Sequence, residues 1–169
     1  MPNMNADFAK TTLVLPPGRR LRPNRLELLA LVAIILLALA LRVYHLGTKS
    51  LWLDELNLLR SSDGHGFLFR QFGYSILDHP PAYMFILRIV MLTLGREEWM
   101  VRLPALIASV ASIPAIWALG RKLSGPAVGL MTALLLAVNP MAVAYGQEAH
   151  SYGLYCLLSI LLLLSLIHI

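Results

Sequence analysis

The 169-residue chain is 58% hydrophobic, and only 14% of its residues are charged. Soluble domains carry about 25% charged residues, so this composition argues against a water-soluble protein and indicates an integral membrane protein. The formal net charge of +5 is then information on membrane orientation, and no nucleic-acid partner is expected.

The chain begins with a polar tail, residues 1–25, which contains five Lys/Arg residues and shows no apolar periodicity. This pattern predicts a flexible segment. Residues 26–44 are apolar except near their ends, which is long enough to cross a bilayer. A signal peptide is the alternative, but the apolar stretch is longer than the hydrophobic region of a usual signal peptide and no A-x-A-like cleavage site follows it. We therefore predict an uncleaved first transmembrane helix.

Residues 45–102 form a long loop in which we predict two juxtamembrane helices, at about 51–62 and 82–94. In the first, Trp52, Leu56 and Leu59 repeat at helical spacing, as in a helix lying at the membrane interface. The second is an apolar run of about 13 residues that follows Pro80 and Pro81. A run of this length is too short to span and is more often interfacial.

Three more apolar segments follow, at 103–119, 126–145 and 151–169, and we predict a transmembrane helix for each. Asn139-Pro140 is expected to kink the second of them. The third contains the single cysteine, Cys156, which excludes an intramolecular disulfide. The chain stops inside this apolar run without a polar flank, so we expect it to be the front part of a longer protein.

The orientation follows from the basic residues. The tail and the hairpin at 120–125 are both basic, and the hairpin contains no acid, which places both on the cytoplasmic side under the positive-inside rule. An even number of crossings must then separate them. The segment 82–94 therefore lies along the surface, and the loop 45–102 faces the outer side together with residues 146–150.

An acid pair, Asp54 and Glu55, opens the first predicted juxtamembrane helix. One interpretation is structural, because the helix dipole favours acids in the first turn. The other is chemical: one carboxylate acts as general base or metal ligand, and its neighbour, rotated by roughly 100°, orients it. Adjacent carboxylates also raise each other's pKa, which suits proton abstraction from a hydroxyl.

Two further groups of polar residues face the same side. His79 stands at the entry to the surface helix, where backbone N–H groups attract phosphate. Arg88 on that helix either reaches an anion or extends to the lipid headgroups. Glu148 and His150 lie between the last two spans, and an ionisable group near membrane depth is a functional candidate. A residue at a helix entry or in a solvated turn is the structural alternative for each.

The ordered set of motifs resembles the N-terminal part of the C-type (GT-C) membrane glycosyltransferases, similar to the bacterial relatives of protein O-mannosyltransferases and to the aminoarabinose and galacturonic acid transferases. The resemblance runs from about residue 26 to the end. It is carried by Leu51-Trp52-Leu53-Asp54-Glu55, His79-Pro80-Pro81-Ala82-Tyr83, Glu98-Trp99 with Arg102-Leu103-Pro104, Leu119-Gly120-Arg121-Lys122-Leu123-Ser124-Gly125, Asn139-Pro140, and Tyr145-Gly146-Gln147-Glu148-Ala149-His150-Ser151-Tyr152.

This resemblance implies an all-α multi-helix bundle in the bacterial plasma membrane. The implied activity is transfer of a sugar from a polyprenyl-phosphate donor to a glycan, lipid or protein hydroxyl on the outer side. The family's first acidic motif maps onto Asp54 and Glu55, with Asp54 as the expected base or metal ligand, and its second maps onto Glu148. His150 stands where the family usually has Arg, so a titratable group replaces a permanent cation.

The candidate residues for binding the donor phosphate or substrate are His79, Arg88, His150 and Tyr152. A divalent cation, Mg²⁺ or Mn²⁺, is left open, with Asp54 and Glu148 as its candidate ligands. A fragment of this length is expected to be inactive by itself. Two alternatives stay open at this point: a component of a membrane transporter, in which the polar groups line a path, and a non-catalytic fragment.

Overall fold

The computed structural model describes residues 23–44, 46–48, 50–63 and 80–167. All regular structure in these residues is helical, which confirms the all-α fold class. The helices are α1 (Arg25–Val43), α2 (Leu53–Asp63), α4 (Pro81–Thr93), α5 (Glu98–Ser124), α6 (Pro126–Val138), α7 (Pro140–Gly146) and α8 (Tyr152–Leu166). The predicted flexible tail up to residue 22, and His79, lie outside the described residues.

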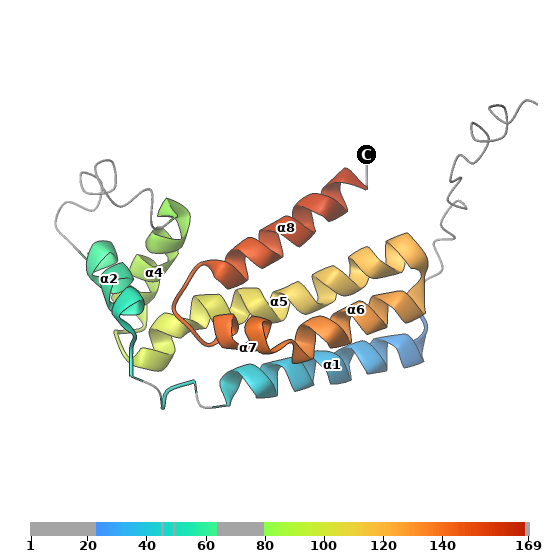
Figure 1. Ribbon diagram of the computed structural model, residues 1–169, viewed down its shortest axis with the longest axis horizontal. Coiled ribbons are helices and arrows are strands. Elements are labelled where there is room, and N and C mark those ends of the chain that lie inside the picture. The colour runs from blue at the N-terminus through green and yellow to red at the C-terminus, as the bar shows by residue number, and fades with distance from the viewer. Residues whose placement is uncertain (1–22, 45, 49, 64–79, 168–169) are drawn as a thin grey trace, which may run out of the picture.

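Three helices form the body of the molecule, α1, α5 and α6, which run side by side (Figure 1). α1 and α6 point in one direction and α5 points in the other. The N-terminus of α1 therefore lies beside the hairpin that joins α5 to α6, where Gly125 adopts a positive φ of 96° that favours glycine. We call this the hairpin end of the bundle.

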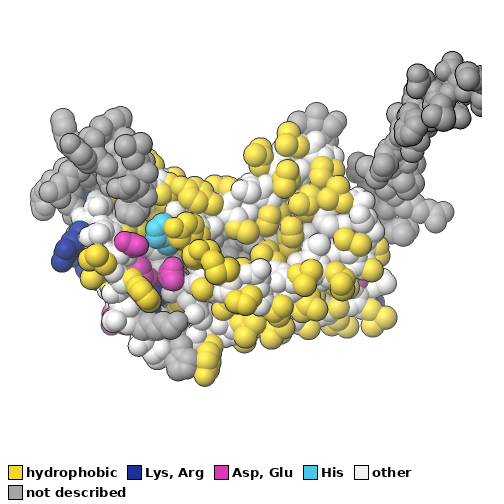
Figure 2. All heavy atoms as spheres, viewed as in Figure 1, with side chains coloured by type: hydrophobic (Ala, Val, Ile, Leu, Met, Phe, Trp, Pro, Cys, Tyr) yellow, Lys and Arg dark blue, Asp and Glu magenta, His cyan; other side chains and the backbone are white. Residues whose placement is uncertain are grey.

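The bundle core consists of small and branched apolar residues: Leu31, Ala38, Ile113, Ala133 and Ala137. Larger apolar side chains point outward from α1, α6 and α8; for example, Leu29, Leu135 and Leu162 are each more than 60% exposed. Figure 2 shows this apolar surface along the length of the bundle. Such a surface is stable against lipid and not against water, so the chain is a membrane protein.

Two helices, α1 and α5, are long and apolar enough to cross a membrane, and the bent pair α6 and α7 makes up to three. The bend measures 61° and lies at Asn139-Pro140, where a kink was predicted. Asn139 caps α7 by accepting a hydrogen bond from the amide of Ala142 at 3.1 Å. α8 is a shorter apolar helix, so the fourth crossing and the sides of the membrane stay predictions.

At the other end of the bundle lie α2 and α4; α2 packs on α4, and α4 packs on the start of α5 (Figure 1). We call this the α2 end. A second apolar core, which includes Leu58, Tyr83, Leu87, Val101 and Ala149, holds these helices together. α4 has 13 residues, a length of about 20 Å at 1.5 Å per residue. It is thus too short to cross the roughly 30 Å hydrocarbon layer.

α5 begins at Glu98, five residues before the predicted span at 103. With the span predicted to begin at 103, Arg102 was expected as the last residue of the loop 45–102. Instead, Arg102 lies inside the helix and is 2% exposed. A helix can contain a buried cation in an apolar setting only where the cation is paired, and its partner defines the candidate site.

Candidate active site

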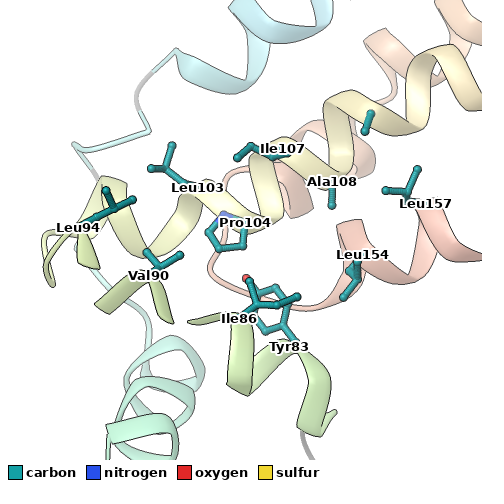
Figure 3. Close-up of a pocket in the computed structure, with 11 residues that line it drawn as sticks. Tyr83, Ile86, Val90, Leu94, Leu103, Pro104, Ile107, Ala108, Leu154 and Leu157 are labelled. Atoms are coloured by element: carbon teal, nitrogen blue, oxygen red, sulfur yellow. The ribbon is translucent and has the colours of Figure 1, made fainter. Parts of the chain in front are cut away.

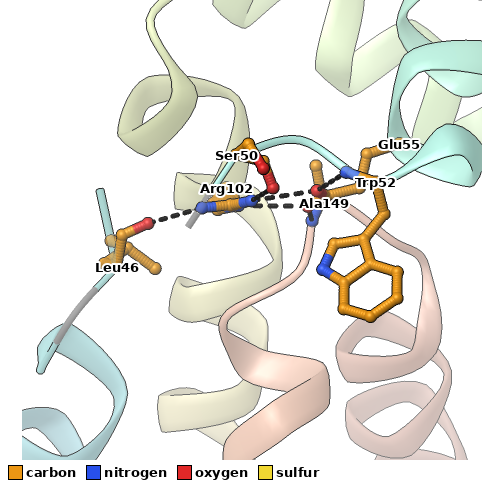
Figure 4. Close-up of polar contacts among 6 residues, drawn as sticks. All are labelled: Leu46, Ser50, Trp52, Glu55, Arg102 and Ala149. Carbon is orange, nitrogen blue, oxygen red and sulfur yellow. Dashed lines mark hydrogen bonds and ion pairs between the residues drawn. The ribbon is translucent and has the colours of Figure 1, made fainter. Parts of the chain in front are cut away.

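The centre of the α2 end is Glu55, which is 2% exposed. Its Oε1 accepts hydrogen bonds from Arg102 Nε at 3.0 Å and from the amide of Ala149 at 2.6 Å. Its Oε2 accepts from Arg102 Nη2 at 2.9 Å and from the amide of Trp52 at 3.0 Å. One buried carboxylate therefore joins α2, α5 and the turn between α7 and α8 (Figure 4).

The bond to Trp52 has a local cause. Glu55 is the third residue of α2, and a glutamate at that position can reach back to the backbone N–H that precedes the helix. The bonds to Arg102 are of another kind, because the guanidinium meets both carboxylate oxygens in a two-pronged arrangement. α2 is thus both started and anchored by the same side chain.

Arg102 also organises the chain that leads into α2. Its Nη1 donates to the carbonyl of Leu46 at 2.7 Å, and its Nη2 donates to that of Ser50 at 3.4 Å. Figure 4 shows these carbonyls and Glu55 arranged around the guanidinium. With five donors and no acceptor, an arginine can serve several oxygens at once, so Arg102 holds Leu46 and Ser50 beside α5.

The charge state of Glu55 follows from these contacts. Burial by itself raises the pKa of the carboxyl, but the hydrogen bonds from Arg102, Ala149 and Trp52 and the nearby positive charge outweigh it. The pKa of Glu55 is therefore held below its ordinary value. A carboxylate that stays ionised and accepts four hydrogen bonds is well suited to anchoring and poorly suited to accepting a proton.

Asp54 lies in the opposite situation. It is exposed, although Glu55 beside it is buried, because successive helical residues are rotated by about 100°. The acid pair is therefore divided between a carboxylate that faces outward and one that faces the protein. The catalytic roles predicted for the pair stay predictions, and the geometry favours Asp54 as the group that meets a substrate.

The turn at 147–151 carries the second set of predicted site residues. Glu148 and His150 are half-buried and Tyr152 is 44% exposed. The amide of His150 donates to the carbonyl of Glu148 at 2.8 Å, which makes the turn tight. Since the amide of Ala149 bonds Glu55, the structure brings this turn against the first turn of α2. Figure 2 shows acidic and histidine side chains gathered at this end.

Contacts with Ser151 and Tyr152 hold the His150 ring. Its Nδ1 accepts from the amide of Ser151 at 3.0 Å, so the proton of the neutral imidazole is on Nε2. The ring also stacks on Tyr152 with centroids 4.2 Å apart and planes 9° apart, and Tyr145 packs against Tyr152 at 4.5 Å. The predicted donor-binding pair His150 and Tyr152 therefore forms one aromatic stack beside Glu148.

Arg88, the other predicted donor-binding cation, is half-buried on α4. Its Nη1 donates to the carbonyl of Ser62 near the end of α2 at 3.3 Å, so it connects the two juxtamembrane helices. This contact gives Arg88 a structural role, and its donor-binding role stays a prediction. His79 cannot be compared, because it lies outside the described residues.

Metal binding was left open for Asp54 and Glu148. Among the described residues, no three His, Cys, Asp or Glu side chains gather in a group that could hold a metal ion. The residues that the structure places here therefore do not make up a ligand set, and we derive no chemical step through a metal.

An apolar pocket of about 340 Å³ lies between α4, α5 and α8 (Figure 3). Its wall includes Tyr83, Val90, Leu103, Ile107 and Leu157. The Tyr83 hydroxyl is buried and has no hydrogen-bond partner among the described groups, and in Figure 3 it points toward Pro104. Burial, with a smaller effect from Glu55, raises the pKa of Tyr83, so its phenol stays protonated.

Sequence reasoning missed three contributors to this site: Arg102, the amide of Ala149 and the apolar pocket. A signal for the first was present, since an arginine within an apolar stretch requires a partner and an acid pair stood in the preceding loop. Nothing in the sequence points to the amide of Ala149, because backbone groups leave no residue-type signature.

Known proteins that match this chain indicate the same family as the motifs do. The family model for dolichyl-phosphate-mannose-protein mannosyltransferase matches residues 78–169. Over 129 residues the chain is 29% identical to "Putative mannosyltransferase YycA" of Bacillus subtilis (strain 168), an alignment that covers 70% of this chain and 18% of that relative. No solved structure matches. The chain therefore spans less than a fifth of the curated relative, and the resemblance drawn from the motifs is confirmed.

Proposed function

The chain belongs to the dolichyl-phosphate-mannose-protein mannosyltransferase family, and from this premise we propose that it is part of a membrane glycosyltransferase. The proposed reaction transfers a sugar from a polyprenyl-phosphate donor to an acceptor hydroxyl at the outer face of the bacterial plasma membrane. Family membership favours this activity over a transport role. The observation that carries the proposal is the junction at Glu55, which brings α2 and the turn 147–151 to one place.

In the proposed mechanism, Asp54 is the general base. It removes the proton of the acceptor hydroxyl as the oxygen attacks the anomeric carbon, and the bond from that carbon to the donor phosphate breaks. The phosphate leaves with the bonding electron pair. A single displacement of this kind inverts the configuration at the anomeric carbon. The exposure of Asp54 supports the assignment, because a base must be accessible to its acceptor.

The leaving phosphate requires stabilisation by donors or cations. His150 is the proposed donor in the described part of the chain, since its Nε2 carries the proton in the neutral form and its ring is held by Tyr152. Glu148 lies in the same turn. We propose that it orients the acceptor or the sugar hydroxyls, because an ionised carboxylate accepts hydrogen bonds and repels a phosphate.

The apolar pocket is the proposed place for the donor's prenyl chain. Its lining is formed by apolar side chains, and Tyr83 at its wall also packs in the apolar core that contains Ala149. A prenyl chain in the pocket would thus have its phosphate end near the turn 147–151. Because a prenyl chain is already in hydrocarbon, the pocket would hold it by van der Waals packing rather than by removal from water, and would thereby orient the donor.

The full-length protein in lipid nanodiscs provides the test. Labelled sugar should be transferred from a polyprenyl-phosphate donor and not from a nucleotide-diphosphate sugar. Transfer from the nucleotide donor alone would refute the proposal.

A pocket variant tests the placement of the chain. Ala111→Leu adds bulk to the pocket wall and should raise the KM for the prenyl-phosphate donor about tenfold, as expected if steric overlap with the prenyl chain costs about 1 to 3 kcal/mol. Ala115→Leu, one turn further along α5 and outside the pocket lining, is the matched control and should leave KM unchanged. Equal KM values in the two variants would remove the prenyl chain from this pocket.

A further inference from the structure

The second buried arginine, Arg42 near the end of α1, is 0% exposed, and within the described residues it donates to a hydroxyl and to backbone carbonyls rather than to a carboxylate. Its guanidinium donates to the carbonyls of Ala137 at 3.1 Å and Leu136 at 3.3 Å. It also donates to the carbonyl of Ala38, one turn earlier in α1, at 3.1 Å. Leu136 is four residues before Pro140, which has no N–H to give it. Arg42 therefore supplies donors to the carbonyls that the break between α6 and α7 leaves open.

The Nε of Arg42 extends the contact to α5. It donates to Ser109 Oγ at 2.7 Å, and this hydroxyl donates in turn to the carbonyl of Ala142 in α7 at 3.3 Å. Gly146 ends α7 against the same group: a Cβ there would lie 2.8 Å from Ser109 Oγ and 3.2 Å from Arg42 Cδ. The last turn of α7 can be this close to Arg42 only because residue 146 is glycine.

The next residue completes a reciprocal arrangement. Gln147 Nε2 donates to the carbonyls of Leu41 at 3.0 Å and Tyr44 at 2.8 Å, at the end of α1. α1 thus caps the broken helix through Arg42, and the residue after the broken helix caps α1 through Gln147. Two residues further on, Ala149 is held by Glu55 from the other side. The turn 147–151 is fixed at both of its flanks.

We propose that Arg42, Ser109, Gly146 and Gln147 form a positioning lock that sets the turn 147–151 against α2. The lock touches neither sugar nor phosphate, and it acts through the residues that the turn presents, Glu148 and His150. A displacement of such groups by about 1 Å can lower a catalytic rate about 100-fold. For its effect on rate, this inference rests on the proposed transferase function.

The test uses the full-length protein with the variant Gln147→Met, which keeps the side-chain length and removes both donors. Amide hydrogen exchange in the peptide covering 145–151 should become faster, and kcat for sugar transfer should fall about 10-fold to 100-fold with donor KM unchanged. Arg42→Lys keeps the charge but has fewer donors in another geometry. Its exchange rate at 145–151 and its kcat should lie between those of wild type and Gln147→Met. Arg42→Met removes all the hydrogen bonds of the Arg42 guanidinium. If that variant does not fold, Gln147→Met and Arg42→Lys decide the test.

Arg121→Met is the matched control, because it removes an α5 arginine at the hairpin end. It should leave both exchange at 145–151 and kcat unchanged. Unchanged exchange in Gln147→Met would overturn the lock, as would faster exchange with wild-type kcat. A wild-type protein that transfers no sugar would overturn the proposed function instead, and the exchange comparison would then decide on the lock by itself.

Discussion

The two ends of α5 each hold an arginine–glutamate ion pair, and the two pairs differ in their surroundings. At the α2 end, Arg102 Nη2 and Glu55 Oε2 are 2.9 Å apart, with side chains 2% and 3% exposed. At the hairpin end, Arg121 Nε and Glu27 Oε1 are 2.7 Å apart, but the arginine is 21% exposed. Judged by distance alone, the second pair would contribute at least as much stability as the first.

Burial and the number of partners reverse that ranking. Glu55 is 2% exposed and accepts hydrogen bonds from three chain segments, whereas Arg121, which bonds Glu27 and lies with its guanidinium 5.7 Å from the Trp117 ring, is partly exposed. A buried pair is costly to break because one charge is left without compensation, while a pair near the surface is screened. The ion pair at the α2 end therefore holds several chain segments together, and we expect its loss to cost more stability than loss of the pair at the hairpin end.

The largest expected effect lies in Asp54, the exposed acid beside the buried pair. Asp54→Asn should lower kcat for sugar transfer by about 10² to 10⁴, the range for loss of a general base. The melting temperature should stay unchanged, because the side chain is exposed. Glu97→Gln, an exposed acid outside the site, should transfer at the wild-type rate. Wild-type kcat in Asp54→Asn would exclude Asp54 as the base.

Removal of one partner of the buried pair should have the next largest effect. Arg102→Met leaves the Glu55 carboxylate buried without its cation, which destabilises by about 3 to 5 kcal/mol. Thermal unfolding of the purified protein measures this. The double variant Arg102→Met with Glu55→Gln should recover part of the loss, because no buried charge remains. A double variant less stable than Arg102→Met would contradict the account.

The pH dependence of stability tests the state of Glu55. Its pKa is lowered in the folded protein, so the unfolded chain binds its proton first as the pH falls. The stabilisation is therefore complete above about 4.3, the pKa in an unfolded chain, and is lost as the pH falls through the lower folded value. The melting-temperature advantage of wild type over Glu55→Gln should be constant from pH 7 to 5 and shrink below. An advantage that shrinks already between pH 7 and 5 would mean that Glu55 has a raised pKa.

The smallest effect is expected at the hairpin end. Glu27→Gln should lower the free energy of unfolding by about 1 kcal/mol or less, because its partner Arg121 is partly solvated. Sugar transfer should proceed at the wild-type rate. A loss as large as that of Arg102→Met, measured by thermal unfolding, would remove the distinction between the two ends.

Much of this architecture could be predicted from local patterns. Helical spacing around Trp52 predicted a helix over 51–62, where the structure has α2 over Leu53–Asp63. The rotation of about 100° between neighbours meant that Asp54 and Glu55 would point in different directions, but the raised pKa expected for an adjacent acid pair is wrong for Glu55, whose pKa is lowered. Asn139-Pro140 marked the break. Each of these depends on residues within one or two helical turns.

The rest depends on contacts between distant residues. Glu55 and Arg102 are 47 positions apart, and Gln147 lies 106 positions from the Leu41 carbonyl it caps. From the sequence, Arg42 and Arg102 could each be interpreted as a residue at the end of a membrane span, because a single sequence does not show which oxygen atoms a buried guanidinium binds. Backbone partners such as the Ala149 amide leave no trace in residue type. The site depends on the Glu55–Arg102 ion pair between α2 and α5, which no local pattern predicts.

The location of the donor phosphate tests most directly whether the α2 end is the active end. A cryo-EM structure of the full-length protein with bound polyprenyl phosphate would measure it. We predict density for the phosphate between the first turn of α2 and the turn 147–151, near His150, with the prenyl chain in the pocket at Tyr83. Density for the phosphate at the hairpin end, beside Arg121 and Lys122, would contradict the account.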